Sequence, residues 1–313
     1  MNASDLYDEL ANAFRPVLDA FGKLHDELAN AFYTTEEMTA SIFLPPQGGE
    51  PMTEREYNEI DAVRRSDLMK IRKSPLHYKW AKEHPEEEES TPSQIFGAAA
   101  HKYLLELGSF YDEYALAPNV DKRTKAGKEE WERFKAENEG KTVITSDDLD
   151  KLWLMQEAVC DHKAAKELLF GTIETPILWT DPETGIDLKI RPDVVAMKDG
   201  RPIIVDYKTV TSCDERTFWR ECDRYGYQLQ AGMYTEGYAL TNYIEVGFAF
   251  VAQEKTPPYA CRVFYCDPEF IEQGNEEYHQ LLRYLKQCQD TNFWPGYSDG
   301  YLMPYAYKEV AEE

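Results

Sequence analysis

The 313-residue chain is poor in basic residues for its number of acidic ones. It contains 34 Lys and Arg against 58 Asp and Glu, which gives a formal net charge of −24. This balance argues against a protein that binds nucleic acid by bulk positive charge. A local basic groove, or metal ions held by carboxylates, could still bind DNA.

Long apolar runs and paired cysteines are also missing from the sequence. No run approaches the roughly 18 residues that span a bilayer, and the acidic N-terminus MNASDLYDEL is unlike a signal peptide. The six cysteines are scattered and form no CxxC pair, so reduced thiols are expected rather than a disulfide scaffold. These features predict a soluble protein of the cytoplasm with no membrane partner.

The sequence does contain enough apolar residues for a large packed core. Hydrophobic residues make up 42% and aromatic residues 13% of the chain, which excludes a chain that is disordered throughout. A length of 313 residues suits one large domain, or one domain with an accessory segment.

The first 50 residues differ from the rest. DELANAF occurs at 8–14 and again at 26–32, and the apolar positions between them follow a heptad-like spacing typical of a helix. The turn-rich stretch PPQGGEP at 45–51 then predicts a linker. We therefore expect a helical N-terminal extension with its linker over 1–50 and a separate domain over 51–313. The extension is either a helix pair packed on that domain or an arm for oligomerisation or partner docking.

Two segments of the predicted main domain are basic. Each is either solvated surface or a set of phosphate contacts at the mouth of a site. The first segment lies within 62–82 and the second within 121–128. Their candidate DNA-contacting residues are Arg64, Arg65, Lys70, Arg72, Lys73, Lys122, Arg123, Lys125 and Lys128.

The order of periodic segments predicts an α/β fold. A helix with a capping box begins at Thr91-Pro92 and carries His101. From Gly171 the apolar period changes to two, and turn signals divide the segment into a three-stranded antiparallel meander that ends near 210. A long helix over about 215–240, two strands and a last helix from 267 follow. The expected architecture is a mixed central sheet flanked by helices.

The second hairpin of the meander carries a group of charged residues. If Asp199-Gly200 is a two-residue turn, Asp193 lies opposite Asp206 and Arg191 lies opposite Lys208. Residues 206 and 208 share one strand face. Two facing carboxylates repel each other, and a bound divalent cation such as Mg²⁺ removes that conflict.

The first hairpin extends this group. If Thr180 pairs with Gly185, Glu174 lies on the same sheet face as Asp193. The alternative for the whole group is a surface ion-pair ladder, which the apolar flanks IVDYK and IRPDVV disfavour. The sequence therefore predicts a metal site on the second hairpin, with Glu174 of the first hairpin beside it.

These residues have a familiar arrangement. RPDVVAMKDGRPIIVDYKT, at 191–209, resembles the D…(D/E)xK core of the PD-(D/E)xK nuclease superfamily. FGAAAHKYLLE and the Gln230-x3-Tyr234 spacing resemble the histidine helix and the Q-x3-Y helix of RecB-type nucleases. SDLMKIRKSPLHYKW and FWPGY resemble flanks of the RecE-like exonuclease (exodeoxyribonuclease VIII) branch. The resemblance covers about residues 52–300 and implies a restriction-endonuclease-like core.

The resemblance also implies residue roles. Asp193 and Asp206 would ligate Mg²⁺, or Mn²⁺ in its place, together with His101 and the main-chain carbonyl of Tyr207. Lys208 would orient or deprotonate the attacking water.

Three further residues would have supporting roles. Glu174 would be an outer metal ligand or would position the water, and Gln230 and Tyr234 would brace the site or touch DNA. Some RecB-type nucleases carry a cysteine-ligated iron–sulfur cluster, but the cysteine spacing here predicts none.

The function implied is that of a Mg²⁺-dependent exonuclease that digests linear double-stranded DNA, most simply from 5′ to 3′. Partners implied by the resemblance are duplex ends, further copies of the chain in a ring of three or four, and a single-strand annealing recombinase. Such a protein would act in homologous recombination of a bacteriophage or prophage. Two alternatives stay open: an endonuclease or single-strand-specific nuclease on the same core, and a catalytically silent DNA-binding or assembly module.

Overall fold

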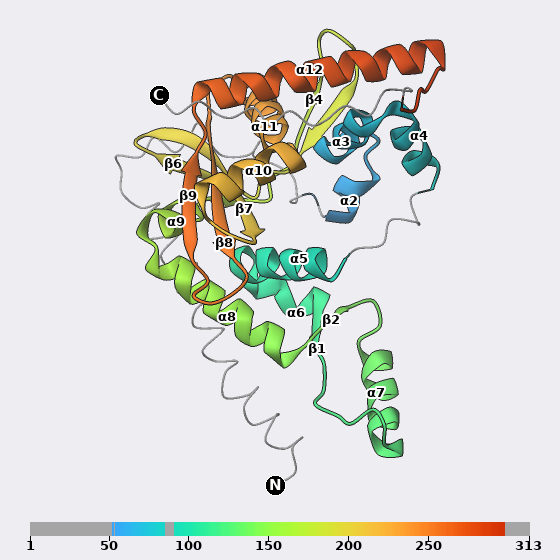
Figure 1. Cartoon of the computed structure of the whole chain (residues 1–313), viewed down its shortest axis with the longest axis vertical. Helices are drawn as coiled ribbons and strands as arrows, with labels where there is room; N and C mark the ends of the chain where they lie inside the picture. The colour runs from blue at the N-terminus through green and yellow to red at the C-terminus, as the bar shows by residue number, and fades with distance from the viewer. Residues whose placement is uncertain (1–51, 53, 85–90, 298–313) are drawn as a thin grey trace, which may run out of the picture.

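A computed structural model describes residues 52, 54–84 and 91–297 of the chain (Figure 1). All structural statements below concern these residues. The DELANAF repeat, the PPQGGEP linker and the predicted domain boundary after residue 50 lie outside them.

A five-stranded mixed sheet forms the centre of the described part (Figure 1). Its strand order is β3 (Thr172–Ile173), β6 (Val194–Lys198), β7 (Arg201–Val210), β8 (Gly247–Glu254) and β9 (Cys261–Tyr265). The β7–β8 pair is parallel and the other pairs are antiparallel. The predicted α/β class with a mixed sheet flanked by helices is confirmed.

Helices pack on both faces of this sheet. Ile204 of β7 packs in a core with α3 (Arg65–Lys73), α11 (Tyr227–Asn242) and α12 (Pro268–Thr291). The next residue, Val205, packs in a second core with α5 (Pro92–Leu105), α8 (Ser146–Asp161) and α9 (Lys163–Leu168). Successive side chains of a strand point to opposite faces, so β7 is apolar on both sides and buried along most of its length.

The remaining elements surround this core. They are α2 (Glu54–Glu59), α4 (Pro75–Glu83), η3 (Leu107–Ser109), α6 (Phe110–Glu113), β1 (Tyr114–Leu116), α7 (Lys125–Glu137), β2 (Thr142–Ile144) and α10 (Glu215–Tyr225). Strands β1 and β2 pair in parallel as a small separate sheet. Figure 1 shows α7 at the end of the molecule farthest from α12.

The predicted three-stranded meander is wrong in one respect. Strands β4 (Ile177–Thr180) and β5 (Asp187–Ile190) leave the central sheet and form a two-stranded sheet of their own. The breaks fall at Pro176 and Pro192, because proline cannot donate to a strand ladder. Glu174, beside the first break, has a positive φ of 52°.

The predicted pairing register is confirmed for one hairpin and differs from the structure for the other. Lys198 pairs with Arg201 across the Asp199-Gly200 turn, as predicted. Thr180 pairs with Asp187 rather than with Gly185. This shift is two residues, an even number, so it leaves each side chain on its predicted face.

The single helix predicted over 215–240 is two helices. Gly226 separates α10 from α11 with a left-handed backbone, φ 63°. Glycine adopts this conformation without a Cβ penalty and commonly ends a helix. The chain therefore changes direction at Gly226, between the partly exposed α10 and the mostly buried α11.

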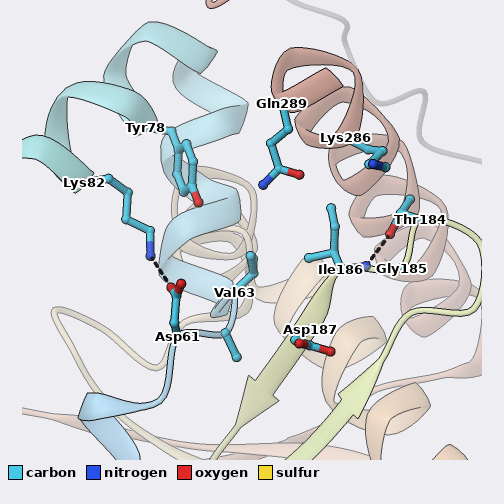
Figure 2. Close-up of a pocket in the computed structure, with 11 residues that line it drawn as sticks. Asp61, Val63, Tyr78, Lys82, Thr184, Gly185, Ile186, Asp187, Lys286 and Gln289 are labelled. Carbon is cyan, nitrogen blue, oxygen red and sulfur yellow. Dashed lines mark hydrogen bonds and ion pairs between the residues drawn. The ribbon is translucent and has the colours of Figure 1, made fainter. Parts of the chain in front are cut away.

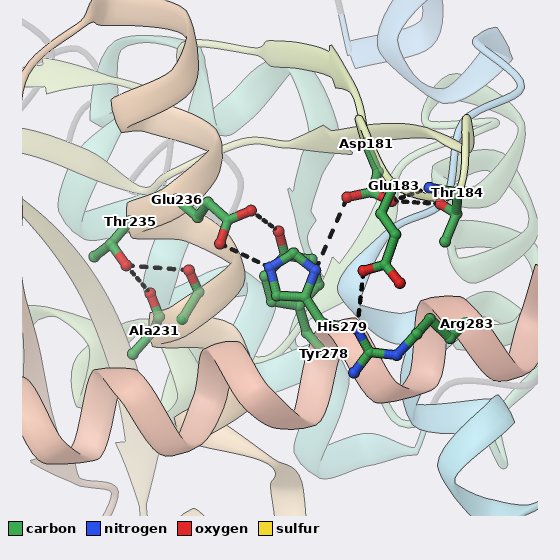
Figure 3. Close-up of polar contacts among 10 residues, drawn as sticks. Asp181, Glu183, Thr184, Ala231, Thr235, Glu236, Tyr278, His279 and Arg283 are labelled. Carbon is green, nitrogen blue, oxygen red and sulfur yellow. Dashed lines mark hydrogen bonds and ion pairs between the residues drawn. The ribbon is translucent and has the colours of Figure 1, made fainter.

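A polar network fixes the β4–β5 hairpin to α11 and α12 (Figure 3). The imidazole of His279 lies 2.9 Å from Glu236 on α11 and 3.9 Å from Asp181 at the end of β4. Asp181 also accepts hydrogen bonds from the backbone and hydroxyl of Thr184, and Arg283 of α12 pairs with Glu183 at 2.9 Å. The hairpin is thus tied to two helices at its tip.

Candidate active site

The site is built where the β4–β5 hairpin leaves and rejoins the central sheet. Glu174 precedes the hairpin and Asp193 follows it, and the Glu174 backbone N–H donates to the Asp193 carbonyl. Asp193 lies one residue before β6, and its carboxylate accepts a hydrogen bond of 2.8 Å from the backbone N–H of Tyr207. The two carboxylates are therefore held by backbone geometry.

Arg191 does not lie opposite Lys208, contrary to the sequence prediction. Because Pro192 interrupts the strand, the Arg191 side chain turns toward Glu174, with Nε 2.5 Å from Oε2. Its guanidinium lies 5.2 Å from the centre of the Tyr57 ring. Arg191 is a site residue that the sequence pairing misplaced.

His101, Glu174 and Asp193 form a cluster suited to a metal ion. Their ligand atoms all lie within 4.8 Å of one another. The His101 Nε2 atom is 3.1 Å from Asp193 and 3.5 Å from Glu174. One imidazole nitrogen and two carboxylates are a donor set that Mn²⁺ and Mg²⁺ accept.

The charges of this cluster show a need for a cation. Burial lowers the pKa of His101, but Asp193 and Glu174 together outweigh it and raise the pKa to about 9. Burial raises the pKa of Glu174 to about 7, against the opposing effects of His101 and Arg191. The protonated imidazole thus supplies positive charge that the two carboxylates require, and a divalent ion would replace it. The residues present therefore fit a divalent metal.

Asp206 lies beside this cluster rather than inside it. Its carboxylate is 2% exposed, lies 2.5 Å from the Lys208 ammonium and accepts a hydrogen bond from the Gln230 amide of α11. Burial raises the pKa of Asp206, and the nearby Asp193 adds to that effect while Lys208 opposes it. The sequence predicted Asp206 as a metal ligand and Glu174 as an outer one. In the structure Glu174 lies in the cluster with His101 and Asp193, and Asp206 pairs with Lys208.

The other two residues of the predicted set lie around this group. Tyr234 is one turn after Gln230 on α11, and its ring packs against Phe248. Burial raises its pKa, with Asp206 the next cause. The Tyr207 hydroxyl donates to Gln253 in the core, while its backbone faces the site. Gln230 braces Asp206, and Tyr234 packs behind it.

The cluster opens into a cleft of about 460 Å³. Besides the cluster, the cleft is lined by Arg191, which lies between β5 and β6, and by residues of α5, the segment after it and β7: Gly97, Ala98, Lys102, Glu106, Glu113, Tyr114, Tyr207, Lys208 and Thr209. A second pocket, of about 430 Å³, lies between α4, α12 and the β4–β5 turn (Figure 2). It is lined by both charge signs, with Lys82 3.8 Å from Asp61, and none of the predicted site residues lines it.

The first basic segment reaches the site at one end only. Arg65, at the start of α3, donates to the Tyr225 carbonyl and lies 6.0 Å from the Tyr227 ring, on which Lys208 also lies at 5.2 Å. Arg72 forms ion pairs with Asp223 and Glu277.

The other members of this segment are mixed. Arg64 donates to Asn58 at 3.2 Å, and Lys73 is exposed at the end of α3. Lys70, one turn earlier, is half-buried. The segment is therefore partly structural.

The second basic segment lies away from the cleft. Lys122 is 3.0 Å from the centre of the Trp131 ring, Arg123 pairs with Asp121 at 2.9 Å, and Lys125 lies 3.8 Å from Glu129. Lys128 is exposed on α7. None of these side chains lines the cleft.

Lys189 is a buried lysine near the site that the sequence patterns did not predict. It is 2% exposed and donates to the carbonyls of Tyr57 and Ile60, at 2.6 and 2.7 Å. Its ammonium lies 4.7 Å from the Tyr57 ring, the ring that also carries Arg191. A charged residue in a strand is usually expected at the surface, so no sequence pattern indicated this buried contact.

Comparison with known proteins gives the class of this chain. It belongs to the family described as a PDDEXK-like domain of unknown function (DUF3799), which matches residues 65–301. The resemblance to the PD-(D/E)xK superfamily is confirmed, and the placement in the RecE-like branch stays a prediction. No curated protein matched the sequence.

Two solved structures resemble the chain at low identity. A "Putative exonuclease" from Eubacterium rectale shows 12% identity and a TM-score of 0.49, covering 76% of this chain and 88% of that one. SSO0001 shows 13% identity and a TM-score of 0.33, with coverages of 73% and 81%. Among the described helices, none is long and apolar enough to cross a membrane.

Proposed function

We propose that this protein is a divalent-metal-dependent deoxyribonuclease that digests linear double-stranded DNA from its 5′ ends. The observation that carries the proposal is the convergence of His101, Glu174 and Asp193 beside Lys208 in one cleft. Phosphodiester hydrolysis needs an activated water, neutralised phosphate oxygens and a nearby cation. This group of residues offers all three together with the metal.

His101, Glu174 and Asp193 would hold the metal, which we take to be Mg²⁺ with Mn²⁺ as a substitute. When bound, the ion neutralises phosphate charge and lowers the pKa of a bound water. Lys208 is positioned by Asp206, which in turn is fixed by Gln230. The lysine ammonium would therefore meet the scissile phosphate or the attacking water in one defined place.

The exonuclease assignment is supported by the sequence flanks. SDLMKIRKSPLHYKW and FWPGY resemble flanks of the RecE-like branch. This resemblance implies a ring of three or four copies, a single-strand annealing partner and a role in phage-type recombination. A protein of this kind would act in the cytoplasm of a bacterial host.

The test is digestion of end-labelled linear duplex and of covalently closed duplex, with Mg²⁺ and with EDTA. We expect Mg²⁺-dependent loss of the 5′ label from linear duplex only, and no loss with Lys208→Ala. Cleavage of closed circles would identify an endonuclease, and digestion of single strands alone a single-strand-specific nuclease. Binding without turnover in Mg²⁺ or Mn²⁺ would identify a silent DNA-binding module. Any of these three outcomes contradicts the proposal.

A further inference from the structure

Helix α10 carries a stripe of arginines that the sequence patterns did not single out. Arg216, Arg220 and Arg224 are spaced four residues apart, so they lie along one face of the helix. All three are exposed. The opposite face is apolar and packs Phe218 and Cys222 into the core.

Among the ion pairs of the described residues, none includes Arg216, Arg220 or Arg224. The acid on the same face, Asp223, pairs with Arg72 of α3 at 3.7 Å. Glu215 at the start of the helix pairs with Arg262 at 3.1 Å. Three guanidinium groups without an ion pair among the described residues thus lie along one helix face of a protein of net charge −24.

Helix α10 is connected at both ends to residues at or near the cleft. The helix begins at Glu215, shortly after Lys208 and Thr209, which line the cleft. It ends at Tyr225, and the Tyr227 ring that follows lies 5.2 Å from the Lys208 ammonium. Phe218 of α10 packs against Phe250 of β8 and Phe264 of β9 on the central sheet (Figure 1).

We propose that Arg216, Arg220 and Arg224 bind the phosphate backbone of duplex DNA outside the scissile bond. The proposal names the substrate-binding surface of the proposed nuclease and so rests on that function. Guanidinium groups match phosphate oxygens in two-pronged hydrogen bonds. Their spacing of about 6 Å along the helix axis lets the three side chains reach phosphates of one strand.

The experiment measures DNA binding in EDTA, where no hydrolysis occurs. The probe is a labelled linear duplex of about 30 base pairs, and fluorescence anisotropy gives the dissociation constant over a range of salt concentrations. In the variant R216Q/R220Q/R224Q we expect the slope of log affinity against log salt to fall by about 2–3, because each phosphate contact contributes about 0.9. Affinity at about 0.1 M salt should fall by roughly 10²-fold or more. The variant R216K/R220K/R224K should keep most of the slope.

A matched control removes the same charge elsewhere. Arg133, Lys163 and Lys286 each lie within 4.0 Å of an acid four residues further along its helix. The variant R133Q/K163Q/K286Q should therefore bind DNA with nearly the wild-type slope. Melting temperatures of both variants establish that they are folded.

An arginine variant that binds like the control variant overturns the proposal. So does one that loses self-association in light scattering while its DNA binding is unchanged, because the stripe is then a contact between copies. These results are separable from the proposed function. If the wild type fails to cleave linear duplex but the stripe variant still loses binding, the nuclease assignment fails and the surface stands. If the wild type cleaves and the stripe variant binds normally, only the surface fails.

Discussion

The charge state of the cleft is set by a few buried groups whose neighbours oppose or favour ionisation. His101 has its pKa raised to about 9 and Glu174 to about 7. Asp193 has its pKa lowered, because His101, Lys208 and the Tyr207 backbone outweigh the effect of burial. Without metal, the cluster is therefore stabilised by the proton on His101, because the pKa of this imidazole lies well above its ordinary value.

The pH dependence of stability follows from these shifts. A raised histidine pKa gives stabilisation that is complete below about 6.5 and is lost as pH rises through about 9. Glu174, with a raised pKa, also favours the folded state less as pH rises from about 4.5 through about 7. In EDTA we expect the melting temperature to fall from about pH 6 to about pH 9.

Added Mg²⁺ should reverse this trend. Metal binding releases the His101 proton, so the metal-induced rise in melting temperature should be larger at the higher pH. His101→Gln should flatten the metal-free profile. A metal-free melting temperature that stays constant or increases over this range would contradict the charge assignment.

Catalysis should depend on Lys208 and Asp193 individually. Lys208→Ala removes the cation that is proposed to meet the scissile phosphate, and Asp193→Asn weakens the proposed metal site, so each should lower kcat on linear duplex by roughly 10²-fold or more. Lys198 lies at the turn of the same hairpin with an exposed side chain. Lys198→Ala is therefore the matched control and should cleave normally. Near-normal rates in Lys208→Ala or Asp193→Asn at saturating Mg²⁺ would contradict the site.

At the scale of elements, the β4–β5 hairpin links the helices to the metal cluster. Its two ends are Glu174 and Asp193, and its tip is tied to α11 and α12 by the network around His279. Val63 also bridges to Leu188 on β5. The packing of α11 against α12 therefore helps to determine where the two carboxylates lie.

The α11–α12 contact should be sensitive to small added volume. A Cβ atom at Gly274 of α12 would overlap the Gln228 carbonyl oxygen of α11, which is backbone and cannot rotate away. Gly274→Ala should lower the free energy of unfolding by about 1–3 kcal/mol, as overpacking commonly does. Urea denaturation gives the value.

The control for this change is Gly108→Ala. A Cβ atom at Gly108 would meet nothing within 4 Å, so its effect should stay within about 0.5 kcal/mol. Equal stability of the two variants would show that the helices tolerate a larger separation.

At the scale of the whole molecule, a net charge of −24 opposes DNA at long range. The proposed DNA binding would then depend on local features: the metal cluster, Lys208 and the α10 arginines. The cations of the second basic segment lie on and before α7, outside the cleft, and several are paired with their own neighbours. Their predicted role in DNA contact stays a prediction.

The N-terminal extension should be dispensable for hydrolysis. The family match begins at residue 65, and the DELANAF repeat and PPQGGEP linker precede it. Deleting residues 1–50 should leave cleavage of short linear duplexes intact and should change the assembly mass in light scattering, because a heptad-like stripe needs a partner. An insoluble or inactive product would mean that the extension belongs to the nuclease core. An active product of unchanged assembly mass would leave partner docking as the role of the extension.

Local sequence patterns predicted the sheet class, the β6–β7 hairpin and most residues of the candidate site. Asp199-Gly200 specifies a tight turn, and strand periodicity then places residues 193, 206 and 208 near one another. The capping box at Thr91 likewise determined where the helix carrying His101 begins. These features depend on local backbone chemistry, which a sequence displays directly.

Tertiary packing determines how those parts meet. It placed Glu174 with His101 and Asp193, turned Arg191 away from Lys208 and buried Lys189 against backbone carbonyls. Each outcome depends on where a prolyl break or a distant helix directs the chain, and residues such as Tyr57 and Lys189 are 132 positions apart. Local periodicity carries no information about such contacts, because they form only when the hairpin packs on the helices.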